Sequence, residues 1–363
     1  MKVFLSSNIS SIEINFLPAL IGSLIGFTSF LSIFANLTIL IVLLHSNLIK
    51  SNPLYILSSL NLFNDIFHGF GFLVFLAPTS FTQNYFFKIL EPFQPFWIFF
   101  MFVFQLSYYS SLLILMVIAI NRMIAVVIPN KAHLINKRAV YYTVSAIYPT
   151  ALLLTLIADY VLPCCRTNYS YKTYSYQFFV WNENKINYKN MLMDLPMNII
   201  TTVIILFCYG AIIAKVIYTN RKDLMKSGAN TELKNSRRRS EIKCALHFAL
   251  ISTFFIAVWV SYRIFPLIVS SSSQEWYSLT GFFMILNISS NSIIYFTMNK
   301  EVQKQLIIFY RKLFGLQTQQ FSNSQNLNNN GQERWAYQRA TRLKPIQTKI
   351  YNCCVKYFCR KNS

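Results

Sequence analysis

The sequence predicts an all-α membrane protein, a seven-transmembrane helix bundle followed by a short amphipathic eighth helix. Of the 363 residues, 54% are hydrophobic and only 12% are charged, whereas soluble domains average about 25% charged residues. Seven apolar stretches are long enough to cross a hydrocarbon core of roughly 30 Å. Lysine and arginine gather in alternate connecting segments, as expected of a chain that crosses the membrane repeatedly.

Each apolar stretch is expected to form one helix, because a backbone in lipid must satisfy its hydrogen bonds within its own segment. The stretches cover residues 17–45, 53–78, 95–122, 139–162, 191–218, 243–270 and 277–298. Together they form a predicted transmembrane domain over residues 17–298. The second and seventh are the most polar, since they carry an aspartate and several asparagines and serines. We expect these polar side chains to face the bundle interior.

The distribution of basic residues predicts the orientation. The connections after the first, third and fifth stretches, with the tail after the seventh, hold 25 lysines and arginines, and all other connections hold 6. Without the long tail the ratio is still 13 to 6. Because basic loops stay cytoplasmic, we expect a plasma-membrane protein with an extracellular segment 1–16 and a cytoplasmic carboxy-terminus. The net charge of +21 then faces anionic lipid, and nucleic acid is not an expected partner.

Two glycosylation motifs agree with this orientation. Asn8 and Asn168 begin Asn-x-Ser motifs on the predicted outer side. Asn36 and Asn287 begin matching motifs inside predicted spans, which shows how readily the motif arises by chance. The first sixteen residues lack the ordered pattern of a cleavable signal peptide. We therefore expect a glycoprotein modified at Asn8 and Asn168.

The predicted cytoplasmic end has two parts. Residues 299–315 alternate basic and apolar side chains at helical spacing, which predicts an amphipathic helix on the inner leaflet. Residues 316–363 are expected to be largely disordered, with an Asn/Gln-rich run at 317–332. The tail cysteines are either palmitoylated or free cytosolic thiols, and they are Cys353, Cys354 and Cys359. Without histidines at ligand spacing they do not predict a zinc site, and no cofactor is expected.

Five polar residues are placed near mid-membrane by their positions along the stretches. They are Asn36, Asp65, Ser111, Asn287 and Asn291. An ionisable group at mid-span costs roughly 2.5–3.5 kcal/mol on insertion scales, so Asp65 is expected inside the bundle. The group either forms a hydrated site for a sodium ion that rearranges on activation, or holds helices together by hydrogen bonds.

Arg122 ends a long uncharged segment, since residues 92–121 contain no Asp, Glu, Lys, Arg or His. An arginine at this point either marks the membrane interface, with its charged head reaching water, or makes a specific interaction at the cytoplasmic face. The surrounding motif, "NRMIAVVIP" from Asn121 onwards, favours the second interpretation.

The order and spacing of these features resemble those of rhodopsin-like G-protein-coupled receptors. Asn121-Arg122-Met123 stands where that superfamily has an acidic-Arg-aromatic triplet, and Asn291-Ser-Ile-Ile-Tyr295 resembles its Asn-Pro-x-x-Tyr motif. Asn36 and Asp65 fit its most typical residues on the first two helices. The resemblance implies an activation switch made of Asn121, Arg122, Tyr209, Asn291 and Tyr295.

A closer resemblance is to the nematode chemoreceptors called serpentine receptor class x. It rests on "NRMIAVVIP", "LPCCRTNYSYKTYSYQF", "SRRRSEIKCALHFALI" and "IIYFTMNKEVQK", and it covers about residues 17–315. It implies a chemosensory receptor that binds an external small molecule or peptide. Such a receptor activates a heterotrimeric G protein through the cytoplasmic ends of its third, fifth and sixth helices. It is not an enzyme, and no catalytic motif is present in the sequence.

The chain departs from the superfamily pattern in three places. The third stretch begins Pro95-Phe-Trp97 without a cysteine, so the usual disulfide tether to the second external loop has no partner. Ile264 stands where a tryptophan is expected. Asn121 cannot carry a negative charge, so a lock on Arg122 requires another partner, for which Glu241 is a candidate.

The resemblance implies a ligand pocket in the outer half of the bundle. The candidate pocket residues are Gln105, Tyr108, Asp194 and Arg263. Arg263 lies roughly 10 Å inside the outer end of the sixth stretch by helical rise. It either holds an anionic ligand or pairs with Asp159 or Asp194.

Two other classes of function remain alternatives. A seven-helix ligand-gated channel would have the opposite orientation, with the amino-terminus inside, against the distribution of basic residues. A membrane transporter would show repeated halves with broken helices, and the sequence shows no such repeat.

Overall fold

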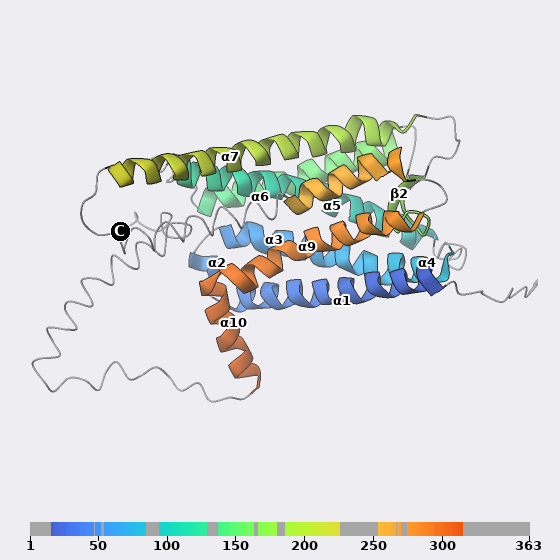
Figure 1. Ribbon diagram of the computed structural model, residues 1–363, viewed down its shortest axis with the longest axis horizontal. Helices are drawn as coiled ribbons and strands as arrows, with labels where there is room; N and C mark the ends of the chain where they lie inside the picture. The colour runs from blue at the N-terminus through green and yellow to red at the C-terminus, as the bar shows by residue number, and fades with distance from the viewer. Residues whose placement is uncertain are drawn as a thin grey trace, which may run out of the picture.

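The computed structural model describes ten segments of the chain. They are residues 16–46, 48–51, 54–84, 94–128, 137–162, 166–179, 186–225, 253–265, 267–269 and 274–314. Within them, six helices are long and apolar enough to cross a membrane, and a shorter apolar helix spans Thr253–Phe265. These helices run side by side along one axis (Figure 1). The predicted fold class, a seven-transmembrane helix bundle, is confirmed.

The helices of the bundle follow the predicted order. Their bounds are α1 Phe16–His45, α3 Leu54–Gly71, α4 Ala77–Thr82, α5 Gln94–Val127, α6 Lys137–Leu156, α7 Leu195–Met225 and α9 Ser278–Met298. A short helix, α2 (Leu48–Ser51), lies between α1 and α3. The last helix, α10 (Lys300–Leu313), leaves the bundle axis at the end opposite β2 (Figure 1).

Three of the helical spans contain a π-helical turn. These turns are Phe72–Leu76 between α3 and α4, Ile157–Val161 after α6 and Asn190–Asp194 before α7. A π turn inserts one extra residue per turn and re-aims the side chains beyond it, and such turns are frequent at functional sites. Here Asp194 is the last residue of its turn, and its side chain is 5% exposed.

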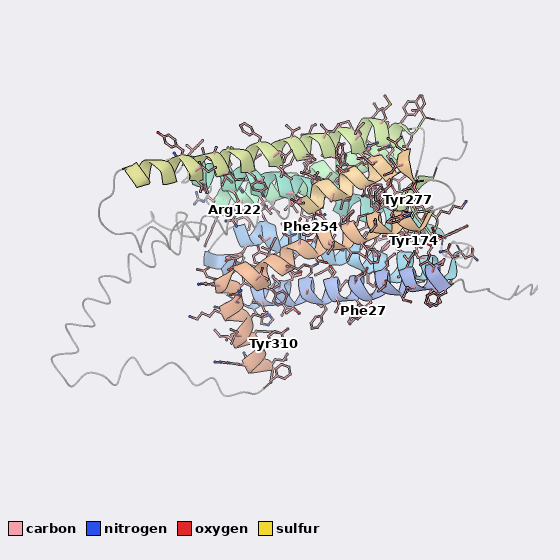
Figure 2. All side chains as sticks on the ribbon, viewed as in Figure 1. Phe27, Arg122, Tyr174, Phe254, Tyr277 and Tyr310 are labelled. Atoms are coloured by element: carbon pink, nitrogen blue, oxygen red, sulfur yellow. The ribbon has the colours of Figure 1, made fainter. Side chains whose placement is uncertain are left out.

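The outer surfaces of the helices are apolar, as the composition predicts. Phe27 on α1 is 61% exposed and projects from the bundle (Figure 2). Pro149 lies inside α6 without ending it, because helices in membranes tolerate proline where neighbouring groups satisfy the freed carbonyl.

A β-hairpin closes one end of the bundle. It pairs β1 (Arg166–Ser170) with β2 (Ser175–Phe179) in antiparallel register, from Arg166 opposite Phe179 to Ser170 opposite Ser175. The hairpin tip approaches α9 at Gly281, where a Cβ atom would lie 2.5 Å from the carbonyl oxygen of Tyr174. Glycine at this position therefore lets the hairpin and α9 come together.

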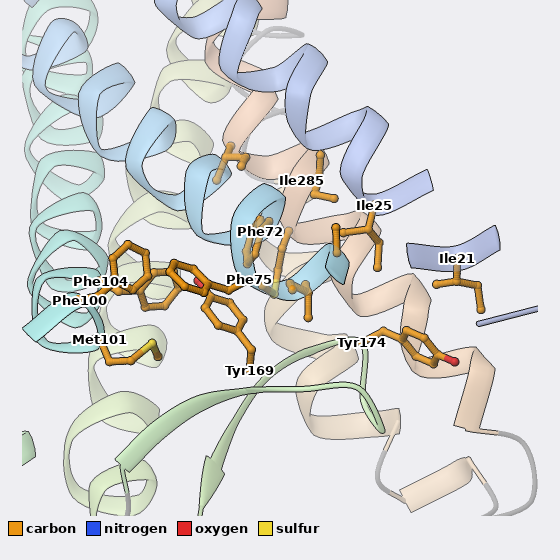
Figure 3. Packing of buried hydrophobic residues seen from close by; sticks show 14 of the residues in the cluster. Ile21, Ile25, Phe72, Phe75, Phe100, Met101, Phe104, Tyr169, Tyr174 and Ile285 are labelled. Carbon is orange, nitrogen blue, oxygen red and sulfur yellow. The ribbon is translucent and has the colours of Figure 1, made fainter. Parts of the chain in front are cut away.

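The hairpin is anchored by an aromatic side chain. Tyr169 on β1 is fully buried and enters an aromatic cluster beside Phe72, Phe75 and Phe104 (Figure 3). Its ring stacks on Phe75 with centroids 6.2 Å apart and lies edge-on to Trp97 at 6.1 Å. Trp97 belongs to the start of the third span, where the sequence lacks the tethering cysteine. Packing of an aromatic ring thus holds the hairpin at the place where the superfamily has a disulfide.

Candidate functional site

A cavity of about 420 Å³ runs through the middle of the bundle from the hairpin to the polar core. Its walls come from β2, α3, α5, the π turn before α7, the helix Thr253–Phe265 and α9. Its lining includes Asp65, Gln105, Tyr108, Ser111, Tyr176, Asp194, Tyr262, Arg263, Asn287 and Asn291. The structure therefore brings all four predicted pocket residues and four of the five predicted core residues to one cavity.

Asp194 is held by two donors from α5. The Tyr109 hydroxyl donates to Oδ1 over 2.7 Å, and Gln105 Nε2 donates to the same oxygen over 3.4 Å. Gln105 also accepts a hydrogen bond of 3.2 Å from the Thr167 hydroxyl. A chain of hydrogen bonds therefore links the hairpin, α5 and the π turn before α7.

Tyr108 contacts the first turn of α7. Its hydroxyl donates to Asn198 Oδ1 over 3.0 Å and accepts from Asn198 Nδ2 over 2.7 Å. Asn198 also donates to the Asp194 carbonyl over 2.6 Å. Sequence reasoning missed Asn198 as a site residue. The four-residue spacing from Asp194 to Asn198 was a signal that could have identified Asn198.

Arg263 does not form either predicted ion pair within the described residues. Its Nη2 donates to Asn190 Oδ1 over 3.0 Å. Asp159 instead pairs with the fully buried Lys189, a residue that sequence reasoning placed in a loop. Asp194 receives the hydrogen bonds from α5 described above. The reason is geometric, because Asp159 lies on the α6 side beside Lys189, while Asn190 lies on the turn that faces Arg263.

Two tyrosines outside the predicted set form the aromatic wall of the cavity. Tyr176 on β2 stacks on Tyr262 with ring centroids 5.0 Å apart, and the Tyr262 hydroxyl donates to the Tyr176 carbonyl over 3.3 Å. Burial, with the nearby charge of Asp194, raises the pKa of Tyr176. Tyr176 is therefore neutral at physiological pH. Its ring gives the cavity an apolar surface, and its hydroxyl can form a hydrogen bond.

The inner end of the cavity is centred on Asp65. Its Oδ2 accepts from Asn61 over 3.1 Å and from Asn291 over 3.0 Å, which joins α3 to α9. Ser111 and Asn287 line the same region. Asn61 lies one helical turn before Asp65 and was missed.

Asn36 does not join this group, contrary to the prediction. Its Nδ2 donates to the Ile288 carbonyl over 3.0 Å and to Ser32 Oγ over 3.5 Å. It thus connects α1 to the backbone of α9 and has a packing role here. Depth along the helix was predicted from the sequence, but the direction of the side chain depends on how α1 rotates against its neighbours.

Several cavity-lining polar atoms are buried without a hydrogen-bond partner in the described part of the chain. They are Asn61 Oδ1, His68 Nε2, Ser111 Oγ, Trp259 Nε1 and Thr280 Oγ1. Buried polar groups in folded proteins are nearly always satisfied by protein, water or ligand. This cavity is therefore suited to hold water and a polar ligand.

Trp259 and Ile264 show how this helix differs from the superfamily pattern. Trp259 lines the cavity, whereas Ile264 is 43% exposed. The tryptophan of this helix therefore reaches the cavity from a position about one and a half turns further from the hairpin end.

Arg122 lies towards the α10 end of the bundle (Figure 2). It belongs to the body of α5, five residues before Val127 ends the helix, whereas the predicted span ended at Arg122. Its charge interacts electrostatically with Tyr55 and Tyr295. Glu241, the predicted lock partner, lies outside the described residues.

Tyr55 connects the predicted switch to α10. Its ring centroid lies 6.4 Å from that of Tyr295, and its hydroxyl accepts from Asn299 Nδ2 over 3.1 Å. Asn299 Oδ1 also accepts from the backbone N–H of Val302 and so caps α10. Sequence reasoning missed Tyr55.

The remaining predicted sites are distributed as follows. Asn121 is half-buried on α5, and Tyr209 packs in the core formed with Tyr109. Asn168 lies in β1, where its Oδ1 accepts from the Tyr169 backbone N–H over 3.0 Å. The predicted modification sites outside the described residues are Asn8, Cys353, Cys354 and Cys359.

The chain is thus a bundle of membrane-spanning helices with a central cavity that strand β2 of the hairpin helps to line. The family model described as the 7 transmembrane receptor (rhodopsin family) matches residues 35–295. The chain therefore belongs to the rhodopsin family of G-protein-coupled receptors, which are receptors rather than enzymes.

Solved structures agree on the fold. The crystal structure of squid rhodopsin matches with a TM-score of 0.61 at 13% sequence identity, over 82% of this chain and 86% of that chain. At this identity the likeness shows the fold alone. No curated protein sequence matches the chain.

Proposed function

We propose that this receptor is chemosensory, binds an external small molecule or peptide in the central cavity, and activates a heterotrimeric G protein. The hairpin end is then extracellular and the α10 end cytoplasmic, in the plasma membrane. The resemblance of sequence motifs to those of nematode serpentine receptors of class x and the distribution of basic residues support this assignment.

One observation carries the proposal. A single cavity extends from Asp194 and Arg263 near the hairpin to Asp65 and Asn291 between α3 and α9. A ligand that fills the outer part can therefore alter the hydration and packing around the Asp65–Asn291 hydrogen bond. A ligand activates the receptor only if it binds the active state of the bundle more tightly than the inactive state.

The inner end of the cavity fits a sodium ion. Sodium is a hard cation that takes oxygen ligands. Asp65 supplies a carboxylate, and the Asn61 and Ser111 oxygens in the same cavity have no hydrogen-bond partner among the described residues. We propose that Asp65, Ser111, Asn287 and Asn291, with Asn61, hold the ion. A bound sodium ion would supply positive charge that offsets the buried carboxylate.

The α10 end supports the coupling role. Arg122 on α5 interacts electrostatically with Tyr55 on α3 and with Tyr295 on α9. We propose that outward movement of the sixth helix frees Arg122 to contact the carboxy-terminal helix of a G-protein α-subunit. Asn121, Tyr209, Asn291 and Tyr295 are the proposed partners in this switch, and the apolar face of α10 lies on the inner leaflet.

The test is expression with a promiscuous G protein, followed by a screen of small molecules and peptides. We expect Arg122→Ala to abolish the response while surface expression persists. Arg311→Ala, on exposed α10, is the matched control and should retain signalling. A full response from Arg122→Ala would refute the coupling mechanism.

A further inference from the structure

We propose that the ligand carries a carboxylate and that Arg263 binds it. The inference rests on the proposed function, since it takes the central cavity to be the ligand site. It specifies the chemical class of the ligand, which the sequence left open between an anion and an internal ion pair for Arg263.

Arg263 has hydrogen-bonding capacity that the described residues leave unused. A guanidinium carries five N–H donors in a planar fork. Within the described segments, one hydrogen bond is formed, from Nη2 to the neutral amide oxygen of Asn190. The side chain is half-buried and lines the cavity. A partly desolvated cation of this geometry binds a carboxylate best, because two parallel N–H···O bonds form together.

The neighbouring acids are engaged elsewhere. Asp159 pairs with Lys189. Asp194 accepts from Tyr109 and Gln105 at one oxygen and interacts electrostatically with both Lys189 and Arg263. Among the described residues, however, no ion pair joins Asp194 to Arg263, and Arg263 donates its hydrogen bond to the neutral amide of Asn190. This difference makes Arg263, rather than Asp194, the stronger charged group available to a ligand.

The position of Asn190 prepares the guanidinium for this contact. Asn190 begins the π turn that ends at Asp194, so the two side chains lie about one turn apart on the same helix face. The hydrogen bond from Arg263 to Asn190 fixes the guanidinium plane before a ligand arrives. Preorganisation of this kind lowers the conformational cost of binding.

The rest of the cavity selects the body of the ligand. Tyr108, Tyr176, Tyr262 and Met284 give aromatic and apolar walls to the same cavity as Arg263. The hydroxyl of Thr280, buried without a partner in the described residues, offers one more donor. A volume of about 420 Å³ lies at the lower end of the range for small-molecule pockets. The ligand is therefore a small acid with an apolar or aromatic body, and not a long peptide.

The experiment uses matched probe sets with the purified full-length receptor in detergent. Each set contains an aryl-alkanoic acid, its primary amide and the amine of the same length, for example 3-phenylpropionic acid, 3-phenylpropionamide and 3-phenylpropylamine. Thermal unfolding is measured with each probe. We expect acids to raise the melting temperature and the matched amides and amines to leave it unchanged.

Variants assign the effect to one residue. Arg263→Gln should weaken acid binding by about 10- to 100-fold, because a hydrogen bond to a charged group is worth about 1.5–3 kcal/mol. Arg263→Lys should retain part of the effect, since it keeps the charge without the fork. Arg311→Gln, on α10 away from the cavity, makes the same exchange and should bind acids as the unmodified receptor does.

The outcomes decide the inference separately from the proposed function. The inference is wrong if no acid stabilises the receptor, if amides or amines do so equally well, or if Arg263→Gln keeps the acid effect. The unfolding measurement requires no G protein. If acids stabilise the receptor but the Arg122→Ala variant still signals, only the coupling mechanism is rejected. If Arg122→Ala loses signalling but the unfolding measurement shows no preference for acids, only the proposed ligand class is rejected.

Discussion

Asn291 donates a hydrogen bond of 3.0 Å to Asp65 and so joins α9 to α3 at the inner end of the cavity. The same carboxylate oxygen accepts from Asn61 over 3.1 Å. A carboxylate that is 5% exposed thus receives two neutral amide donors. Any change in its charge or in a bound cation must alter the contact between these two helices.

Asp65→Asn should separate folding from cation sensitivity. The amide oxygen can still accept from one neighbouring amide, so we expect the receptor to reach the cell surface. The negative charge is lost, so the response to agonist should no longer depend on sodium. Dose–response curves at low and high sodium measure this, and curves for Asp65→Asn that keep the sodium dependence of the unmodified receptor would contradict the proposed site.

Tyr169→Ala should release the hairpin from the bundle. Removing a buried aromatic ring costs about 3–5 kcal/mol of stability, so we expect a lower melting temperature and less receptor at the surface. Tyr169→Phe is the sharper control. The Tyr169 hydroxyl is buried without a hydrogen-bond partner in the described residues, so its removal should be neutral or stabilising. If Tyr169→Phe lowers the melting temperature as much as Tyr169→Ala does, the aromatic ring is not what anchors the hairpin.

Burial also raises the pKa of Tyr169 well above its ordinary value. The phenol therefore stays protonated throughout the physiological range. We expect the anchor to be independent of pH between about 5 and 9, which thermal unfolding across that range would check.

Gly281→Ala should displace the hairpin tip from α9. The added Cβ would meet the Tyr174 carbonyl oxygen at 2.5 Å, which forces a backbone shift costing roughly 1–3 kcal/mol. Gly210→Ala on α7 is the matched control, because nothing lies within 4 Å of its Cβ position. Thermal unfolding of the two variants should differ, and equal melting temperatures would disprove the close approach.

Glycosylation mapping tests the orientation. If the hairpin end is extracellular, Asn168 and Asn8 are available to the glycosylation machinery, and enzymatic removal of glycans should increase gel mobility. Asn8→Gln and Asn168→Gln should each remove part of that shift. An epitope at the amino-terminus that stains only after permeabilisation would place this end inside and favour the inverted channel.

The bundle itself was predictable because its signals are local. Long apolar runs and the distribution of basic residues do not depend on which helices touch. The span that carries Arg122 was identified, although the helix continues to Val127, since an apolar pattern does not show where a helix ends once it emerges from lipid. Asp65 and Asn291 were expected at similar depth inside the bundle, because polar side chains are costly in lipid, and the structure joins them by a hydrogen bond.

The contacts of the remaining polar residues could not be predicted with the same accuracy. Asn36 and Asp65 occupy similar depths, yet Asn36 binds the backbone of α9. Arg263 reaches Asn190 rather than an acid, because Asp159 is already paired with Lys189. These choices depend on helix rotation and on the π turns, which change the face of each side chain and leave no clear mark in the sequence.

The amino-acid sequence alone determined that this chain is a helical membrane protein with polar groups in the middle of its second and seventh spans. Hydrophobic transfer and the cost of unsatisfied backbone groups in lipid act on each segment separately, so composition and spacing are sufficient for that conclusion. Only the tertiary structure decided that the outer charges and the inner carboxylate share one cavity, and that Tyr169 anchors the hairpin. Both arise from contacts between segments far apart in the chain, and those contacts depend on how the helices and the hairpin pack together.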